Sequence, residues 1–315
     1  MKFTSGYWLI RREITPLYAV EYADHRTEGN VLTVYAPGKQ IEGRGDTLNI
    51  GMLTICLSSP MEDVIKVSIR HFEGAAYRGP FAEVRQTDPQ VQIEETDTQI
   101  IYRSGRTSAV IDKRPGSWGI RFLDGERELT ETSYRNMAYM QNSDTGRNYM
   151  VEQLALDVDE SIYGLGERFT PFVKNGQVVD MWNEDGGTAS EIAYKNIPFY
   201  ISNKGYGVLV DNEGDVSFEI ASEKVERLQF SAEGERLDYY VINGSDPKQT
   251  VSRYTELTGK PALPPAWSFG LWLTTSFTTN YDEETTSGFI QGMADRDIPL
   301  HVFHFDCYWM EAYEW

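Results

Sequence analysis

The chain has 315 residues, which predicts two domains or one large one, and its 48 acidic and 29 basic side chains give a formal net charge of −19 at pH 7. A chain this acidic offers no basic face to a phosphate backbone, so nucleic acid is excluded as an expected partner. Hydrophobic residues make up 40% and aromatic residues 13%, which is enough for a large core and excludes disorder over the whole length.

Residues 1 to about 245 alternate between apolar and polar side chains with a period of two, which is typical of half-buried strands. Clear examples are Val64–Arg70 and residues 237–242. Turn signals such as Pro37-Gly38 separate these runs, and no long helical stretch interrupts them. The pattern predicts a mainly β fold, a large antiparallel β-sandwich with more than a dozen strands in two sheets.

The pattern changes after residue 243, where a short helix is predicted. Asp246 is a capping residue type, and Pro247 fits the first helical position. Apolar residues then follow at helical spacing until Gly259, and the prolines beyond it prevent continuation. We therefore expect a β-sandwich domain over residues 1–246. Residues 247–315 are expected to form the first part of an α/β domain.

The last fifty residues have the pattern of a strand, a helix and a second strand. The apolar runs are residues 267–273 and 300–305, and residues 282–293 between them have helical spacing. Such a unit places its functional side chains at the carboxyl ends of its parallel strands. The candidate site residues are therefore 274–277 and 306–308. The second group begins with a lone carboxylate, Asp306.

Two earlier stretches also contain residue types that carry chemistry. Residues 163–168 lack the third glycine and the following helix of a nucleotide-binding turn, so a tight backbone turn is the simpler interpretation. Residues 181–187 combine Trp182, Asn183 and Asp185 with paired glycines, a mixture that favours sugars, because aromatic rings pack on C–H groups and amides or carboxylates bind hydroxyls. A polar surface turn is the alternative, and the acidic residues do not alternate as in a calcium loop.

The cysteine and histidine positions predict neither disulfides nor a metal site. Cys56 and Cys307 lie far apart, so no disulfide framework is expected and a reduced compartment fits. His301 and His304 would point to opposite faces of a strand, which disfavours a metal pair. The N-terminal apolar patch is shorter than a signal peptide requires, and no run approaches the roughly 18 apolar residues of a membrane span. We expect a cytoplasmic protein with no membrane partner.

Five motifs along nearly the whole chain together resemble glycoside hydrolase family 31, with the closest likeness to its bacterial α-xylosidases. They are YGLGERF at 163–169, WNEDGG at 182–187, KNIPF at 195–199, PALPPAWSFGLW at 261–272 and FHFDCYW at 303–309. The resemblance implies an N-terminal β-sandwich followed by a (β/α)8 barrel. Residues 247–315 would then supply only the first βα units of that barrel.

The family resemblance also implies a retaining α-glycosidase. In that mechanism one carboxylate attacks the anomeric carbon and a second protonates the leaving oxygen, so no metal or organic cofactor is implied. The family places both catalytic Asp residues on later barrel strands. No catalytic residue is therefore assigned here, and we expect the 315 residues alone to be inactive.

The substrate-binding residues that the resemblance assigns are Asp185, Phe277, Asp306, Cys307 and Tyr308. Asp306 would hold the hydroxyls of a non-reducing xylose, Asp185 would approach from a sandwich-domain loop, and the other three would shape the far side of that subsite. Family α-glucosidases often have a second carboxylate where Tyr308 stands. Aromatic bulk there disfavours the C6 hydroxymethyl group of glucose, so an α-xylosyl oligosaccharide is the expected substrate.

Two other functions stay open at this point. An α-glucosidase of the same family is one, because closely matching α-xylosidases tend to have Phe where this chain has Tyr308. A non-catalytic carbohydrate-binding or assembly module is the other, although residues 267–273 and 300–305 would then leave open strand edges. A homo-oligomer is a further expectation that the sequence leaves open.

Overall fold

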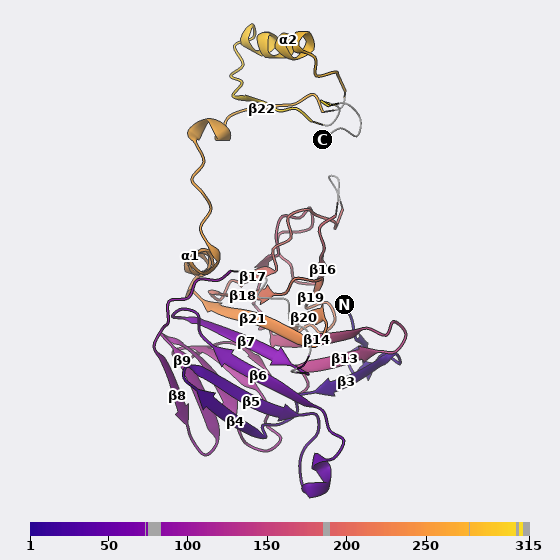
Figure 1. The fold of residues 1–315 in the computed structure, drawn as a ribbon, viewed down its shortest axis with the longest axis vertical. Helices are drawn as coiled ribbons and strands as arrows, with labels where there is room; N and C mark the ends of the chain where they lie inside the picture. The colour runs from indigo at the N-terminus through magenta and orange to yellow at the C-terminus, as the bar shows by residue number, and fades with distance from the viewer. Residues whose placement is uncertain (73, 75–82, 185–189, 277, 307–308, 311–315) are drawn as a thin grey trace. The chain divides into compact units, whose positions relative to one another are not determined.

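The structure is a computed structural model that describes residues 1–72, 74, 83–184, 190–276, 278–306 and 309–310. The chain forms two compact units, Met1–Gly259 and Lys260–Trp315 (Figure 1). Antiparallel strands build most of the first unit, whereas a strand, a helix and a strand build the second.

The largest sheet of the first unit has eight antiparallel strands in the order β15-β17-β18-β21-β7-β6-β5-β4. Its strands are β4 (Asp24–Glu28), β5 (Val31–Pro37), β6 (Met52–Ser58), β7 (Val64–Arg70), β15 (Ile162–Gly164), β17 (Phe199–Ser202), β18 (Tyr206–Asp211) and β21 (Arg236–Asn243). A 3-10 helix, η1 (Arg44–Thr47), lies in the connection between β5 and β6.

Three smaller antiparallel sheets complete the first unit. The six-stranded sheet has the order β16-β19-β20-β14-β13-β3, with β3 (Ile14–Tyr18), β13 (Ala138–Asn142), β14 (Asn148–Ala155), β16 (Gln177–Met181), β19 (Val216–Ile220) and β20 (Arg227–Glu233). The five-stranded sheet has the order β12-β11-β10-β9-β8, with β8 (Val91–Glu95), β9 (Gln99–Ser104), β10 (Thr107–Asp112), β11 (Ile120–Asp124) and β12 (Arg127–Thr132). A short hairpin pairs β1 (Thr4–Ser5) with β2 (Leu9–Ile10).

One contiguous core draws side chains from all three large sheets. Ile65 and Val67 of β7 and Leu237 of β21 are fully buried in it. Phe122 of the five-stranded sheet and Phe230 of the six-stranded sheet belong to the same core. Because alternate side chains of a strand point to opposite faces, each strand gives one face to this core. The antiparallel β-sandwich predicted from the period of two is confirmed, but three large sheets surround its core where two were expected.

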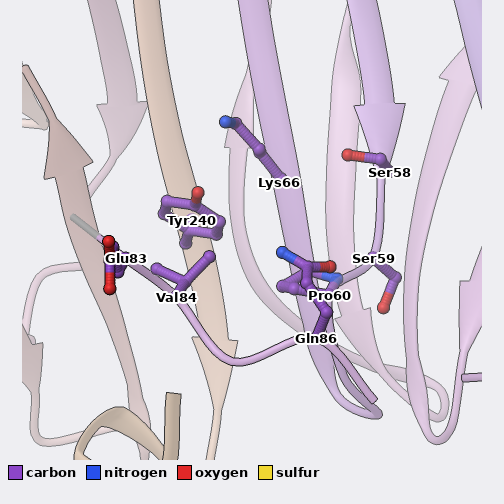
Figure 2. A pocket seen from close by; sticks show the side chains of 8 residues that line it. All are labelled: Ser58, Ser59, Pro60, Lys66, Glu83, Val84, Gln86 and Tyr240. Carbon is purple, nitrogen blue, oxygen red and sulfur yellow. The ribbon is translucent and has the colours of Figure 1, made fainter. Parts of the chain in front are cut away.

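The opposite face of the eight-stranded sheet presents polar side chains on three adjacent strands. Lys66 on β7 has Ser58 on β6 and Tyr240 on β21 as its direct cross-strand neighbours. The Lys66 ammonium lies 3.0 Å from the Asp238 carboxylate and 5.2 Å from the centre of the Tyr240 ring. Figure 2 shows Ser58, Lys66 and Tyr240 among the residues that line a cavity of about 470 Å³.

Helix α1 (Pro247–Thr258) covers an apolar part of the same face. Asp246 caps the helix, since its side chain accepts a hydrogen bond from the Gln249 amide at 2.9 Å. Tyr254 of the helix stacks on Phe199 of β17 with ring centres 3.9 Å apart. The predicted helix is therefore confirmed, and it packs within the first compact unit. The domain boundary expected between residues 246 and 247 stays a prediction.

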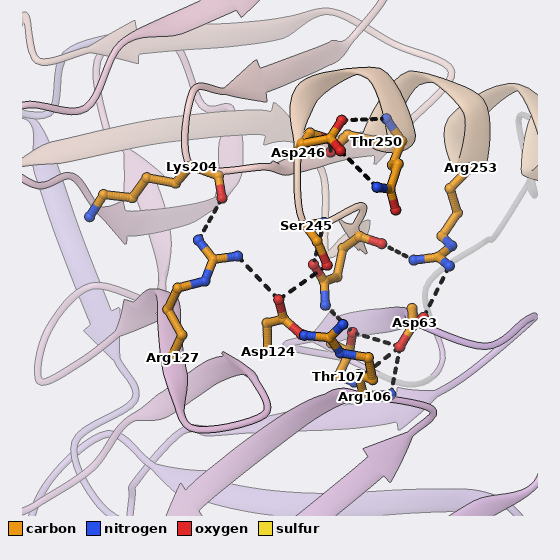
Figure 3. Close-up of polar contacts among 12 residues, drawn as sticks. Asp63, Arg106, Thr107, Asp124, Arg127, Lys204, Ser245, Asp246, Thr250 and Arg253 are labelled. Carbon is orange, nitrogen blue, oxygen red and sulfur yellow. Dashed lines mark hydrogen bonds and ion pairs between the residues drawn. The ribbon is translucent and has the colours of Figure 1, made fainter.

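A polar cluster fixes α1 to the sandwich (Figure 3). Arg253 of the helix forms an ion pair of 3.0 Å with Asp63, whose carboxylate also accepts a hydrogen bond from the Arg106 amide at 2.6 Å. Beside it, the buried Asp124 carboxylate lies 2.9 Å from the Arg106 guanidinium and 3.2 Å from that of Arg127. Buried carboxylates are costly unless they are paired, so this cluster restrains the helix and the strands together.

The second unit is a parallel strand–helix–strand unit, as the sequence predicts. β22 (Trp272–Leu273) pairs in parallel with β23 (Val302–Phe303), and α2 (Glu283–Ala294) connects them. The strand predicted over residues 267–273 is shorter than expected, because η2 (Ala266–Phe269) takes up its first half. The backbone amides there form hydrogen bonds within the 3-10 turn instead of with a neighbouring strand. No helix in the described part of the chain is long and apolar enough to cross a membrane.

Glu152 is a fully buried carboxyl group at the junction of the three large sheets. Its backbone belongs to β14, and its carboxylate accepts hydrogen bonds from the Thr132 hydroxyl of β12 at 2.6 Å and from the Tyr239 hydroxyl of β21 at 3.1 Å. Burial raises the pKa of Glu152 from 4.5 to about 7, and the hydroxyl donors offset part of that effect. Both protonation states of Glu152 are therefore populated near neutral pH in the folded protein.

Replacing the ionisable group tests this assignment. Because its folded-state pKa is raised, the stability that Glu152 contributes below pH 4.5 is lost as the pH rises through about 7. Relative to Glu152→Gln, the wild-type chain should lose up to about 3 kcal/mol of unfolding free energy across that window. Urea denaturation at several pH values measures the difference. Glu94→Gln, at an exposed position of β8, is the control, and parallel curves for wild type and Glu152→Gln would contradict the assignment.

Candidate functional site

One of the five predicted substrate-binding residues lies within the described part of the chain. Asp306 is described, whereas Asp185, Phe277, Cys307 and Tyr308 lie outside the described residues. Asp306 comes shortly after β23, and the parallel pairing with β22 continues past that strand, since the His304 amide donates a hydrogen bond to the Leu273 carbonyl at 2.8 Å. The carboxyl ends of both strands therefore lie at one edge, as a parallel unit requires.

Tyr281 connects the segments that follow these two strands. Its hydroxyl lies 3.3 Å from the Thr274 hydroxyl, and its ring meets the edge of Phe305 with centres 5.2 Å apart.

His301 has a packing role, because its Nδ1 accepts a hydrogen bond from the Leu271 amide at 3.2 Å. Among the described residues, no group of three or more His, Cys, Asp or Glu side chains could hold a metal ion.

The turn at residues 163–168 contacts the backbone at residues 195–199, and glycine permits this approach. Gly164 and Gly166 have φ angles of 101° and 85°. A Cβ on Gly166 would lie 2.0 Å from the Lys195 carbonyl oxygen, and the next amide, that of Glu167, donates to this same oxygen at 2.9 Å. The tight turn predicted here is confirmed, and its glycines serve backbone packing.

Arg168, the next residue, ties together both flanks of the segment that contains Trp182. Its guanidinium donates to the carbonyl of Asp180 at 3.1 Å on one flank and to that of Glu191 at 2.9 Å on the other. It also donates to the Asn196 side-chain oxygen. Burial lowers the pKa of Arg168 below its ordinary value, and carbonyl dipoles face its charge in this partly dry environment.

Asn196 extends this network to Trp182 itself. Its side-chain nitrogen donates to the Trp182 carbonyl at 2.9 Å, to the Asn183 side-chain oxygen at 2.7 Å and to the Ala193 carbonyl at 2.9 Å. The backbone reinforces this connection, because the Glu184 amide donates to the Ala193 carbonyl at 3.2 Å. The two ends of this segment are therefore held side by side at its base.

A cavity of about 290 Å³ lies beside Trp182. Its aromatic, amide and carboxylate lining residues are Trp182, Asn183, Asn196, Asn212, Glu213 and Asp215. The Trp182 side chain is 61% exposed, so its ring is available to a ligand. An exposed ring surrounded by amides and carboxylates is the combination that the sequence predicts for a sugar site.

Arg168 and Asn196 are not among the residues predicted for this site. Arg168 stands in the turn motif, where it was expected only to take part in a local turn. Its partners are backbone carbonyls and one amide, and a linear sequence gives no signal for such acceptors. Asn196 lies in the KNIPF motif, so the motif marks the place without revealing the hydrogen bonds.

Removing the guanidinium should loosen this segment. In Arg168→Ala we expect the Glu184 amide to exchange its hydrogen roughly 30-fold faster, which corresponds to about 2 kcal/mol of lost hydrogen bonding. Arg168→Lys should recover only part of the protection, because an ammonium lacks the planar fork that reaches both flanks. Hydrogen–deuterium exchange measures this effect. Arg147→Ala, which removes an exposed arginine paired with Glu233, is the control, and unchanged protection in Arg168→Ala would refute the role.

Two family models match the chain. The glycosyl hydrolase 31 N-terminal galactose mutarotase-like domain matches residues 54–219, more than half of the chain. The glycosyl hydrolases family 31 TIM-barrel domain matches residues 261–315. The expected order, a β-sandwich followed by the first part of a (β/α)8 barrel, is thereby confirmed.

Curated relatives match along the full chain. Alpha-xylosidase XylQ of Lactiplantibacillus pentosus is 53% identical over 315 residues, covering 100% of this chain and 41% of the relative. An alpha-xylosidase of Emericella nidulans is 45% identical over 334 residues, covering 100% of this chain and 43% of the relative. The chain therefore spans less than half the length of these relatives.

Solved structures share the fold at lower identity. A family 31 dextranase of Flavobacterium johnsoniae has a TM-score of 0.76 at 24% identity, covering 93% of this chain and 34% of that one. A family 31 alpha-xylosidase from a soil metagenome, complexed with xylose, has a TM-score of 0.70 at 16% identity, covering 89% and 41%. These structural matches agree with the two matched domains, and the chain belongs to glycoside hydrolase family 31.

Proposed function

We propose that this chain is the N-terminal part of a retaining α-xylosidase, which releases terminal α-xylose from oligosaccharides. The observation that carries the proposal is the identity of 53% and 45% to two alpha-xylosidases over the entire chain. Both domains of the chain contribute to these matches, so the likeness extends beyond a shared sandwich.

The sugar-binding groups that we propose are those that the family resemblance assigns. Asp306, after β23, would accept hydrogen bonds from the hydroxyls of the terminal xylose, and Asp185 would approach the same sugar from the segment that Arg168 holds at its base. Phe277, Cys307 and Tyr308 would line the far side of that subsite. The cavity beside Trp182 supports a sugar site in the sandwich unit, because its ring and polar groups are of the sugar-binding type.

The bond-breaking step requires two further carboxyl groups. In a retaining mechanism one carboxylate attacks the anomeric carbon and the leaving oxygen takes the proton of the other, with the two groups about 5–5.5 Å apart. Water then attacks the glycosyl-enzyme, and the second group accepts its proton. We place this pair on barrel strands other than β22 and β23, so the residues described here would bind the sugar without cleaving it.

This division of labour predicts that the 315-residue chain has no hydrolytic activity. The full-length enzyme should hydrolyse p-nitrophenyl α-xyloside, whereas the 315-residue chain should release no nitrophenol above the rate without protein, because neither catalytic carboxylate is among its assigned residues. Turnover by the purified short chain would refute the placement of the catalytic pair. Far-UV circular dichroism of the same sample establishes that the chain is folded.

Tyr308 should set the preference for xylose over glucose in the full-length enzyme. The extra CH₂OH group of glucose would meet its ring, and rejection of a group of that size is worth about 10- to 200-fold in kcat/KM. Tyr308→Ala should therefore raise kcat/KM for p-nitrophenyl α-glucoside relative to the xyloside by at least about tenfold. Tyr134→Ala, at an exposed sandwich position, is the control, and an unchanged ratio in Tyr308→Ala would exclude the proposed role.

An α-glucosidase is the second candidate function. It is favoured by an alpha-glucosidase of Bacillus thermoamyloliquefaciens, which is 27% identical over 262 residues and covers 80% of this chain. The ratio of kcat/KM for the two nitrophenyl glycosides with the unmodified full-length enzyme decides between the candidates. The cytoplasmic location and a homo-oligomeric state stay predictions from the sequence.

A further inference from the structure

The cavity of about 470 Å³ on the outward face of the eight-stranded sheet has a polar floor (Figure 2). Ser58, Lys66 and Tyr240 form that floor, and they are cross-strand neighbours on β6, β7 and β21. Because the sheet fixes the spacing of neighbouring strands, these three polar groups keep their positions without support from a loop. This cavity shares no lining residue with the one beside Trp182.

The wall of the cavity is a segment that crosses this face. Glu83 and Gln86 supply its polar groups and Val84 supplies apolar surface, while Pro60, in the connection between β6 and β7, adds apolar surface beside it. The segment is held in place by its backbone. The Arg85 amide donates to the Leu257 carbonyl of α1 at 2.8 Å, and the Thr87 amide donates to the Pro60 carbonyl at 2.8 Å. Backbone hydrogen bonds therefore fix the wall, as they fix the strands of the floor.

Several polar groups at the cavity retain hydrogen-bonding capacity. Within the described part of the chain, the side chains of Ser58, Glu83 and Gln86 have no hydrogen-bond partner. The Lys66 ammonium carries three donors, and its contacts with carboxylates are one at 3.0 Å to Asp238 and a longer one at 4.0 Å to Asp211. Hydroxyl, amide, carboxylate and ammonium groups thus converge on one space.

The charges around the cavity favour a neutral ligand. The Asp238 carboxylate pairs with both Lys66 at 3.0 Å and Arg236 at 2.6 Å, and Asp211 lies 4.0 Å from Lys66. With Glu83 at the wall, three carboxylates face two cations among these residues, so an anion would be repelled. A ligand with many hydroxyls can both donate to Glu83 and accept from Lys66. Its C–H groups could pack on the apolar surface of Val84.

We propose that this cavity is a carbohydrate-binding site that takes a neutral monosaccharide or disaccharide. Its volume falls within the range of about 300–1,000 Å³ that is typical of small-molecule sites. Ser58, Lys66, Glu83 and Gln86 bind the hydroxyls, and Pro60 and Val84 contact the C–H face. The site needs no catalytic carboxylates, so it is independent of the proposed hydrolytic function.

A titration of the 315-residue chain with D-xylose, D-glucose and maltose, each followed by ¹H–¹⁵N correlation spectra, tests the proposal. At least one sugar should cause saturable shifts of the backbone amides of Ser58, Lys66 and Gln86, with a Kd on the order of a few millimolar, as expected for a ligand of this size. The absence of saturable shifts at these amides with all three sugars at millimolar concentrations overturns the proposal.

Variants then locate the binding. Glu83→Ala and Gln86→Ala change exposed side chains, so the fold should persist while affinity falls about tenfold for each lost charged or polar contact. Arg85→Gln is the matched control, because this residue lies between them in the sequence and does not line the cavity. Its affinity should equal that of the wild-type chain.

A cavity-filling variant gives a second, independent measurement. Phenylalanine is well suited to a strand, and in Ser58→Phe its ring would occupy the space above the floor. This variant should therefore abolish the sugar-induced shifts of the Lys66 and Gln86 amides. The thermal midpoint of this variant shows that it is folded. Unchanged sugar affinity in folded Ser58→Phe overturns the proposal, as does equal weakening by Arg85→Gln and Gln86→Ala.

Discussion

The buried carboxyl group of Glu152 connects the three large sheets of the first unit. Its backbone lies in the six-stranded sheet, while Thr132 of the five-stranded sheet and Tyr239 of the eight-stranded sheet donate their hydroxyls to it. An unsatisfied carboxyl group at this depth would cost several kcal/mol, so the sheets must keep the arrangement that supplies both donors. Because Glu152 fixes how the sheets pack in the apolar core, it also fixes the positions of the side chains on their outward faces.

Strict alternation along β7 and β21 then determines the use of the other face. Because Ile65 and Val67 alternate with Lys66, a strand that fills the core also presents polar groups outward. Helix α1 covers the region of that face where the outward residues are apolar. Asp238 pairs with Lys66 and Arg236 in the neighbouring region, which can then tolerate partial burial without a covering helix.

Local patterns in the sequence predicted much of this fold. The period of two predicted the sandwich, and Asp246 with Gly259 predicted the limits of α1. Contacts between distant residues were not predictable in this way. Two backbone carbonyls that Arg168 contacts lie 12 and 23 residues away, and Tyr240 lies opposite Lys66 only because β21 pairs with β7 in the sheet. The strand–helix–strand pattern placed candidate site residues at 274–277 and 306–308, but their roles came from resemblance to the family, because a lone carboxylate after a strand does not identify its ligand.

Arg168 shows why a carbonyl-bound arginine suits the base of a segment that we propose to bind a sugar. A carboxylate partner would fix the guanidinium to one point, whereas the planar fork of Arg168 reaches the carbonyls of Asp180 and Glu191 on both flanks at once. Hydrogen bonds at the base restrain the ends of the segment and leave the exposed Trp182 ring free of that network. Rigid ends lower the entropic cost of ordering such a segment around a sugar, so the same contacts that stabilise the turn would also strengthen binding.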